Sequence, residues 1–413
     1  MGTGSSVPKK HGLPHSTDPT VNHMKQILAE AQKQIDVVPN KNIVHCKDLR
    51  PTCHFVLLSR VRNDFTKLGT LGSGNFTEVR LLQENDSKLL FAGKTFYKPT
   101  SPLHRQGDFD DEEVQSEIDI MRRISHPNIV TLHRVYDEPD RWVLVQEIAF
   151  GGDLRQLLMA RAEKEAPEKV APSEEKTDLY NSDSTKKKPD RKYGRVGEEE
   201  AAIYFVDVVA AIAYLHAHRI AHRDLKPENI FRRADAPDTD LMLGDFGFAR
   251  MLVGGRKLSS YCGSPSYMAP EVVGNYGADD EETRNMPRSY SLECDLWSLG
   301  CILYLFLCGE TPFGRGSTDE TLKRVRKGVY SIDGPIWSQV SSEAKDLVKS
   351  LLQMKPSDRP SAKDVLLKDP WLRKKAKARV ERRERELREL FRFEINTGRL
   401  RLSDMSEAET VDL

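Results

Sequence analysis

The sequence predicts an α+β fold of two lobes, a small antiparallel sheet with one helix followed by a larger and mostly helical lobe. Between residues 65 and 147 the chain alternates short apolar runs with turn residues, which is the pattern of strands joined by turns. After Gly151-Gly152, apolar residues fall mostly at helical spacing up to residue 372. We therefore expect one two-lobed domain over residues 65–372.

Composition narrows the class of protein. The 413 residues have a formal net charge of +0, so we expect no nucleic-acid partner that requires a globally basic surface. Six cysteines form no CxxC pair and no secretory signal peptide is visible, which together favour a reducing, cytoplasmic compartment. The longest apolar run, residues 296–308, is too short to span a bilayer and predicts a buried core helix.

An N-terminal extension, residues 1–64, precedes the domain. Its first 22 residues are rich in Gly, Ser, Pro, Thr and His and predict disorder. Residues 23–36 predict a short helix, because their apolar positions follow helical spacing. Residues 41–64 fit no single element, and we expect them to pack on the domain or lead into it.

The small lobe opens with strands. The runs 79–82 and 89–92 flank the turn residues Glu84-Asn85-Asp86 and predict a β-hairpin. Residues 110–124 predict a helix with one apolar face. That face consists of Val114, Ile118, Met121 and Ile124. Two further strands are predicted at 129–136 and 142–147.

A charged insert, residues 161–194, interrupts the larger lobe. Half of its 34 residues are charged and its apolar residues show no period, which predicts a disordered, solvated loop between two helices. A regulatory or docking role stays open, because the insert holds several serines and the run Lys186-Lys187-Lys188.

The residues that indicate chemistry lie between His222 and Glu271. The string His222-Arg223-Asp224-Leu225-Lys226-Pro227-Glu228-Asn229 is followed by Asp245-Phe246-Gly247, sixteen residues after Asn229, and then by Ala269-Pro270-Glu271. A carboxylate base with two metal-binding side chains suits the transfer of a phosphoryl group to a hydroxyl. This ordered set resembles the protein kinases, which implies ATP and Mg²⁺ as cofactors and proteins as substrates.

The resemblance also implies residue roles. Asp224 would orient the acceptor hydroxyl and take its proton, and Lys226 would neutralise charge on the γ-phosphate. Asn229 and Asp245 would hold Mg²⁺ through hard oxygen ligands. Lys94 would contact the α and β phosphates, and Glu117 would pair with Lys94 because a buried lysine needs a partner.

The nucleotide site would lie under a glycine turn, where backbone N–H groups can approach phosphate. This chain has Thr77 where the family pattern has a third glycine. The implied contacts are Leu71, Gly72, Ser73, Gly74, Val79, Ala92, Lys94, Gln146, Glu147, Ala149 and Phe231. Four residues match the hydrophobic column of the family, namely Met121, Leu132, His222 and Phe246. His222 would therefore be structural.

Two architectural ion contacts are implied as well. Asp295 would cap the backbone of the 222–229 loop from a buried helix. Glu271 would pair with Arg359, and the loss of either partner should be severe.

Lys226 and Ser264 match serine/threonine kinases and not tyrosine kinases. The stretches 328–337, 344–347 and 369–372 resemble the calcium/calmodulin-dependent kinase group, and 245–250 with 262–271 give a weaker similarity to autophagy-initiating kinases. Asp153 and Glu228 match positions that favour basic residues upstream of the phosphorylated residue.

Regulation is expected at the segment after Asp245. Arg223, next to Asp224, places positive charge that an activation-loop phosphate commonly neutralises in kinases with this arginine. Ser260 matches the usual position of that phosphate, so an upstream activating kinase is an expected partner.

The two ends suggest further contacts. Gly2 and Ser6 fit an N-myristoylation pattern, and one acyl chain would give only weak membrane association. The tail, residues 373–413, begins with a basic amphipathic helix at 373–395. We expect an exposed helix that extends the last helix of the lobe, while a calmodulin-binding, active-site-blocking segment stays the alternative.

Two other classes of function are alternatives to an active kinase. A nucleotide-binding pseudokinase scaffold is disfavoured because Lys94, Asp224 and Asp245 are intact. A membrane-tethered adaptor acting through the insert at 161–194 is the other alternative. We expect an active protein serine/threonine kinase.

Overall fold

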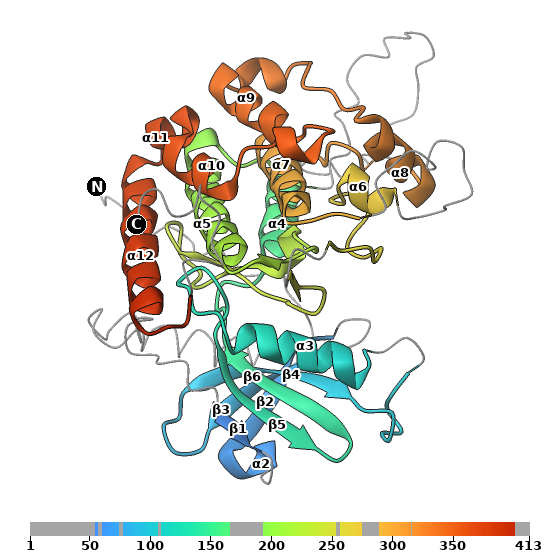
Figure 1. The fold of residues 1–413 in the computed structure, drawn as a ribbon, viewed down its shortest axis with the longest axis vertical. Coiled ribbons are helices and arrows are strands. Elements are labelled where there is room, and N and C mark those ends of the chain that lie inside the picture. The colour runs from blue at the N-terminus through green and yellow to red at the C-terminus, as the bar shows by residue number, and fades with distance from the viewer. Residues whose placement is uncertain are drawn as a thin grey trace, which may run out of the picture.

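The computed structural model describes residues 54–56, 60–73, 77–105, 109–165, 193–252, 257–274, 289–314 and 316–400. Figure 1 shows a small lobe of strands with helix α3 and a larger lobe of helices, with α12 along one side of the larger lobe. The predicted two-lobed α+β fold is confirmed. The predicted helix at 23–36 and the acylation candidate Gly2 lie outside the described residues.

The small lobe contains a six-stranded sheet in the order β1-β5-β6-β4-β3-β2. Its strands are β1 (His54–Val56), β2 (Phe65–Ser73), β3 (Glu78–Glu84), β4 (Leu90–Tyr97), β5 (Leu132–Glu138) and β6 (Arg141–Glu147). Strands β2 to β6 pair antiparallel as predicted, and Leu81 lies opposite Ala92 in the predicted hairpin. Strand β1 differs, because it pairs parallel with β5 and places His54 beside Arg134. It comes from the segment at 41–64 that the sequence left unassigned.

Helix α3 (Asp111–Met121) begins where it was predicted and ends earlier. Its start is fixed by Asp110 and Glu113, which form a reciprocal capping box. The prediction extended to Ile124, whereas the helix stops at Met121. One reason lies just beyond, where the backbone N–H of Ser125 donates to the hydroxyl of Tyr214 at 3.0 Å and not to a helix carbonyl.

Strand β5 begins three residues later than predicted, for a similar reason. Ile129 forms a bridge with Leu243 of β9 (Leu241–Leu243), and the N–H of Val130 donates to the carbonyl of Leu243 at 2.9 Å. The segment between α3 and β5 therefore hydrogen-bonds to the larger lobe before it enters the sheet.

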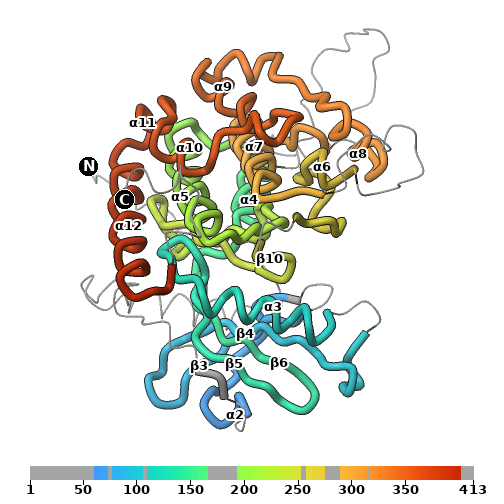
Figure 2. The backbone as a smooth tube through the Cα atoms, in the orientation of Figure 1, coloured from blue at the N-terminus to red at the C-terminus, as the bar shows by residue number. Residues whose placement is uncertain are grey.

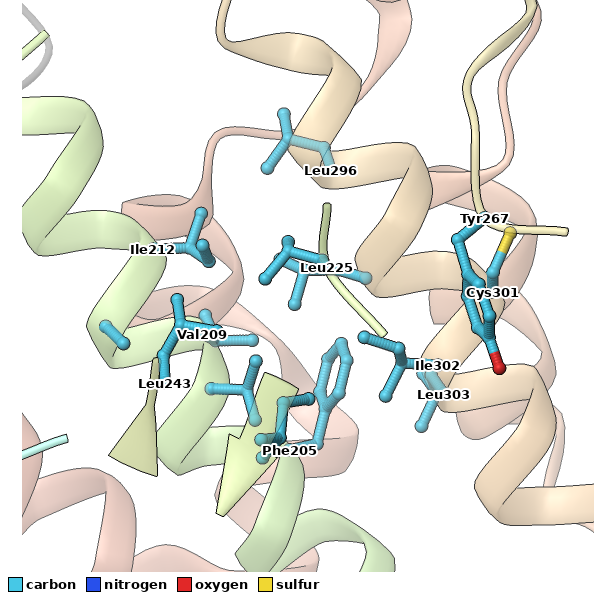
Figure 3. Close-up of a cluster of buried hydrophobic side chains, with 14 of the residues drawn as sticks. Phe205, Val209, Ile212, Leu225, Leu243, Tyr267, Leu296, Cys301, Ile302 and Leu303 are labelled. Carbon is cyan, nitrogen blue, oxygen red and sulfur yellow. The ribbon is translucent and has the colours of Figure 1, made fainter. Parts of the chain in front are cut away.

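The core of the larger lobe lies between α5 (Glu198–Ala217) and α7 (Glu293–Cys308). Figure 3 shows side chains of α5, including Phe205 and Val209, in one cluster with Leu225 and with Leu296 of α7. The prediction of a buried helix at 296–308 is confirmed, since α7 is buried along this whole run. Helix α5 is long and apolar enough to cross a membrane, but 89% of its most apolar window is buried inside the protein, as in a core helix.

The remaining helices of this lobe are α4 (Leu154–Glu165), α6 (Pro270–Val273), α8 (Thr318–Lys327), α9 (Ser342–Leu351), α10 (Ala362–Lys368), α11 (Pro370–Lys375) and α12 (Lys377–Asn396). Its short strands are β7 (Ile220–Ala221), β8 (Ile230–Arg232), β9 and β10 (Arg250–Met251). Strands β8 and β9 form a two-stranded sheet, and β10 pairs with β7. A short helix, α2 (Val61–Asp64), precedes β2.

The charged insert is shorter at both ends than predicted. Helix α4 continues to Glu165, because Arg161 forms an ion pair with Glu200 of α5 at 2.5 Å. At the other end Tyr193 is buried, and the N–H of Gly194 donates to Leu158. Residues 166–192 lie outside the described part of the chain.

Helix α12 begins at Lys377 and not at residue 373 as predicted, because residues up to Lys375 belong to α11 and the backbone turns at Ala376. Figure 2 shows α12 running alongside α5. The expectation that it is simply exposed is wrong for one face. Val380, Arg383 and Leu387 are buried, because this face packs against the larger lobe. On its outer side Glu384 and Arg388 form an ion pair at 2.7 Å.

Candidate active site

Lys94 on β4 is a buried cation held by two carboxylates. Its Nζ lies 2.7 Å from Oε1 of Glu117 on α3 and 2.8 Å from Oδ1 of Asp245. The predicted pair with Glu117 is confirmed, and Asp245 is an additional partner. Burial alone would lower the pKa of Lys94, but the charges of Asp245 and Glu117 outweigh it and raise the pKa. The lysine therefore stays charged, and it connects the small lobe to the segment after β9.

Asp245 follows β9 and has a left-handed backbone, with a φ of 59°. Its pKa is lowered to about 2, since burial, which would raise the pKa, is outweighed by the charge and hydrogen bond of Lys94. The preceding residue, Gly244, lies against Phe231, where an added Cβ would come within 2.9 Å of the aromatic ring. Only glycine allows this approach without a shift of the ring. The result is an ionised, partly exposed carboxylate, a hard oxygen ligand of the kind that Mg²⁺ prefers.

Asp224 lies in the loop between β7 and β8, and its carboxylate is surrounded by polar donors. Nζ of Lys226 is 2.5 Å from Oδ2, and the hydroxyl of Ser264 donates to Oδ1 at 3.0 Å. The side-chain amide of Asn229 donates to the Asp224 carbonyl at 2.8 Å and to Oδ2 at 3.1 Å. Three of the predicted residues, Asp224, Lys226 and Asn229, are therefore brought together. The sequence did not predict the contact with Ser264.

Ser264 reaches this position because the adjacent Gly263 allows a close approach. Gly263 has a φ of 102°, and an added Cβ would lie 2.6 Å from the carbonyl of Arg223. The segment after Asp245, which includes Gly263 and Ser264, is therefore in backbone contact with the 222–229 loop beside Asp224.

The 222–229 loop is held by Asp295 of α7, as predicted. The backbone N–H groups of His222 and Arg223 each donate to the Asp295 carboxylate at 2.9 Å, and Nε2 of His216 lies 2.9 Å from it. The ring of His222 packs edge-on against Phe246 at 5.2 Å. These contacts agree with the structural role expected for His222.

A second predicted contact, between Glu271 and Arg359, is also confirmed. Both guanidinium Nη atoms donate to the carboxylate, at 2.6 and 2.8 Å, and both side chains are buried. Arg359 also lies over the ring of Trp297 at 5.2 Å. This pair joins α6 to the segment before α10.

The strand register aligns most of the predicted nucleotide contacts. Gly72 of β2 lies opposite Val79 of β3, and Ala92 of β4 lies opposite Gln146 of β6. Phe231 comes from β8 of the larger lobe, next to Gly244. Leu71 and Ser73 belong to β2, Glu147 ends β6 and Ala149 follows it, while Gly74 lies outside the described residues.

The end of β6, which would contact the adenine edge together with the residues after it, has a partner that the sequence did not suggest. Arg233 donates through Nη1 to the carboxylate of Glu147 and through Nη2 to the carbonyl of Pro127 at 2.6 Å. Gln146 has an inward contact, since its amide lies 3.3 Å from the sulfur of Met121. This contact links Gln146 to the predicted hydrophobic column.

Arg223 contacts the predicted phosphorylation position. Its Nη1 donates to the hydroxyl of Ser260 at 2.7 Å and to the hydroxyl of Tyr290 at 2.9 Å, and its Nε donates to the carbonyl of Phe248 at 2.6 Å. Burial, and then the charge of Arg223, lower the pKa of Arg250. A phosphate on Ser260 would meet positive charge.

The two acidic residues expected to bind a basic substrate residue are both engaged. Asp153 accepts the backbone N–H of Gln156 at 2.8 Å at the start of α4. Oε1 of Glu228 lies 3.2 Å from Nε of Arg155. Arg155 was not singled out from the sequence, because nothing local indicates that the side chain turns back toward Glu228.

Comparison with known proteins agrees with this geometry. The family model of the protein kinase domain matches residues 65–372. Calcium/calmodulin-dependent protein kinase type 1B of Rattus norvegicus is 32% identical over 296 residues, which cover 72% of this chain and 71% of that protein. Death-associated protein kinase 2 of Mus musculus is 33% identical over 311 residues, 75% of this chain and 72% of that protein.

A third relative is much longer than this chain. Serine/threonine-protein kinase DCLK3 of Mus musculus is 31% identical over 326 residues, which cover 78% of this chain but only 35% of that protein. All three similarities concern serine/threonine kinases of the calcium/calmodulin-dependent group. The chain therefore belongs to the protein kinase family and is a serine/threonine kinase of that group.

Proposed function

We propose that the chain transfers the γ-phosphoryl group of ATP, with Mg²⁺, to serine or threonine of proteins that carry basic residues upstream of the phosphorylated residue. The observation that carries the proposal is the position of Lys94, 2.7 Å from Glu117 and 2.8 Å from Asp245. It supports an assembled site, because the small lobe, α3 and the segment after β9 meet at one cation. Lys94 would then bind phosphate oxygens of the nucleotide.

The residues present fit a bound Mg²⁺. The carboxylate of Asp245 is ionised, with a pKa lowered to about 2, and its side chain is 40% exposed. Asn229 donates its amide N–H to Asp224, which leaves its amide oxygen as an acceptor. Both oxygens are hard ligands suited to this cation. When bound, Mg²⁺ supplies charge neutralisation for the phosphates.

Asp224 is suited to orient the acceptor hydroxyl. It is buried, and the ammonium of Lys226, the hydroxyl of Ser264 and the amide of Asn229 fix both of its carboxylate oxygens. We propose that Asp224 accepts the proton of the substrate hydroxyl while Lys226 stabilises charge on the phosphoryl group. Held in this way, the carboxylate needs little rearrangement when the substrate arrives.

The substrate preference rests on Asp153 and Glu228. In the structure Glu228 pairs with Arg155 at 3.2 Å, with the two side chains 38% and 40% exposed. An exposed pair of this kind is weak, about 0.2–1 kcal/mol, so a substrate arginine can compete for Glu228. We therefore expect a moderate preference for arginine or lysine about three residues before the phosphorylated residue.

Calmodulin is the partner that most needs a test. One relative carries calmodulin dependence in its name, and the basic helix for which calmodulin binding is the alternative is α12. Val380 and Leu387 of α12 are buried, so calmodulin would have to compete with the larger lobe for this face. Titration with calcium-loaded calmodulin, read as a change in transfer rate, would measure that competition.

The proposal is tested with the purified full chain, Mg·ATP and a peptide library that varies the residues around a central serine or threonine. We expect phosphopeptides with arginine or lysine upstream, and loss of transfer when EDTA removes the metal. A preference for acidic residues or for a following proline would contradict the substrate proposal. Transfer that persists in EDTA would contradict the metal role of Asn229 and Asp245.

A further inference from the structure

Helix α12 carries three arginines that converge on one carboxylate. Arg383 is fully buried, with Nε 2.8 Å from Oδ1 of Asp207 on α5 and Nη2 2.8 Å from Oδ1 of Asp240. Arg379 and Arg382 also contact the Asp240 carboxylate. Burial would raise the pKa of Asp240, but the charges of the three arginines lower it. The helix lies beyond residue 372, where the family match ends.

From these carboxylates the contacts continue into β9. The second oxygen of Asp207 accepts the N–H of Leu241 at 2.9 Å, and the carbonyl of Asp240 accepts the N–H of Arg233 at 3.0 Å. Leu241 is the first residue of β9, and Asp245 follows two residues after that strand ends. Strand β9 has only three residues and pairs only with β8 among the named strands. Besides its bonds to Asn128 and Val130, β9 is held at its first residue by the contacts at Asp207 and Asp240.

The turn between β8 and β9 is also joined to the end of β6. Arg233 reaches from the turn between β8 and β9 to the carboxylate of Glu147 and the carbonyl of Pro127. The side-chain amide of Asn128 donates to the carbonyl of Leu241 at 2.7 Å. The arginines of α12, strand β9 and the expected adenine-binding segment therefore belong to one continuous polar network.

The far end of α12 reaches the small lobe by a second route. The hydroxyl of Tyr214 donates to Glu394 of α12 at 2.7 Å and accepts the N–H of Ser125 at 3.0 Å. Phe391 stacks on the Tyr214 ring with 6.0 Å between centroids. Ser125 follows α3, the helix that carries Glu117. The far end of α12 thus contacts a group that holds Ser125, while its first turns reach Pro127 and Asn128 only through Arg233 and Leu241.

We propose that α12 is a positioning element for the nucleotide site. The three arginines of α12 hold Asp240, the residue before β9. Arg233 links the turn before β9 to Glu147, so the position of Asp240 affects the position of Glu147. The planar guanidinium donates in fixed directions, so several such bonds on one carboxylate leave it little freedom to move. These arginines act through β9 and touch no substrate. The inference rests on the proposed function only in assuming that a nucleotide binds beside Glu147 and Asp245.

The test measures nucleotide affinity and stability in the same variants of the full chain. Asp240→Asn removes the charge that the three arginines share, and Arg382→Gln removes the most exposed of them, with a side chain 41% exposed. Arg385→Gln is the matched control, because Arg385 lies on the same helix and is exposed. Calorimetric titration with Mg·ADP gives the Kd, and thermal unfolding gives Tm. We expect the Kd to rise roughly 2- to 30-fold in Asp240→Asn, less in Arg382→Gln, and not in the control.

A double variant that includes Arg233→Gln distinguishes a positioning role of α12 from a purely stabilising role. In an Arg233→Gln background, Asp240→Asn should weaken Mg·ADP binding by less than it does in wild type, because residue 233 no longer links the turn before β9 to Glu147. A lower Tm with an unchanged Kd in both Asp240→Asn and Arg382→Gln would overturn the proposal and leave α12 as a stabilising helix only. If Asp240→Asn does not fold, Arg382→Gln decides alone. Binding of Mg·ADP requires no phosphoryl transfer, so an inactive protein would contradict the proposed function without affecting this test.

Discussion

Two clusters in this molecule each place a buried cation between carboxylates of distant segments. In the small lobe Lys94 lies between Glu117 and Asp245, and in the larger lobe Arg383 lies between Asp207 and Asp240. They differ in access, because the Asp245 side chain is 40% exposed while Arg383 and Asp207 are fully buried. The open cluster can exchange a protein contact for a ligand. The closed cluster can only hold helices and strands together.

The choice of cation fits this difference. A lysine ammonium is a compact point charge on a flexible chain, so Lys94 can share its charge with a phosphate without losing both carboxylates. The Arg383 guanidinium donates to Asp207 on α5 and lies 2.8 Å from Oδ1 of Asp240, so it joins α12 to α5 and to the residue before β9. A lysine therefore suits the cluster that is open to a ligand, and an arginine suits the cluster that fixes geometry.

Removal of the cation from the closed cluster should have the largest effect. In Arg383→Gln, Asp207 loses a buried partner, and we expect the free energy of unfolding to fall by about 3–5 kcal/mol. Urea denaturation measures this loss. The control Arg385→Gln should stay within about 0.5 kcal/mol of wild type, because it changes an exposed residue. A loss below about 1 kcal/mol in Arg383→Gln would mean that the cluster is not closed in solution.

A change in the open cluster should affect transfer more than stability. In Glu117→Gln, Lys94 keeps Asp245 as a partner but loses the carboxylate that fixes it toward α3. We expect kcat/KM to fall about 10²-fold, since a misplacement of about 1 Å can cost that much. The unfolding free energy should fall by less than in Arg383→Gln. Equal stability losses with normal transfer would abolish the distinction between the two clusters.

These two clusters also show what sequence can and cannot predict. The hairpin at 79–92 and the start of α3 were predicted from local spacing, and the pairs Lys94–Glu117 and Glu271–Arg359 from the resemblance to protein kinases. The contacts of Arg383 were not, since α12 contains many arginines and only the fold shows which one is buried.

The other missed features are also contacts between distant segments. The parallel pairing of β1 with β5 joins residues about 80 positions apart, and periodicity says nothing of such a partner. Two further contacts were missed for the same reason, because they also join distant segments: the pair between Arg155 and Glu228 and the contact of Ser264 with Asp224. The end of α3 was misplaced because a hydroxyl from α5 takes the N–H of Ser125.

A third cation, Arg223, offers a way to extend the comparison. In the described residues its side chain donates to the hydroxyls of Ser260 and Tyr290 and to the carbonyl of Phe248. A phosphate on Ser260 would add a strong anionic acceptor beside it. Charge-assisted hydrogen bonds contribute about 1.5–3 kcal/mol. We therefore expect Ser260→Ala to be about tenfold or more less active than wild type phosphorylated at Ser260.

Mass spectrometry of the purified protein before the transfer assay establishes whether Ser260 carries phosphate. Ser259→Ala is the matched control, since it changes the adjacent serine only. If Ser260→Ala were as active as a Ser260-phosphorylated wild type, the segment around Arg223 would have to be ordered in another way.

The smallest effect is expected at the exposed pair of Arg155 and Glu228. Arg155→Ala frees Glu228 for a substrate arginine, and we expect the preference for upstream arginine to rise by up to about fivefold, the value of an exposed ion pair. The ratio of kcat/KM for peptides with arginine or alanine at that position measures it. A lower ratio in Arg155→Ala would show that Arg155 helps to bind the substrate and does not compete with it.

The most direct test of the central claim is transfer of γ-phosphate from Mg·ATP to a basic serine peptide by the purified protein, beside Asp245→Ala. We expect transfer by wild type and its loss in the variant, with the variant still folded because Lys94 keeps Glu117. Equal silence of both proteins, with Ser260 phosphorylated, would contradict the account and favour a nucleotide-binding scaffold.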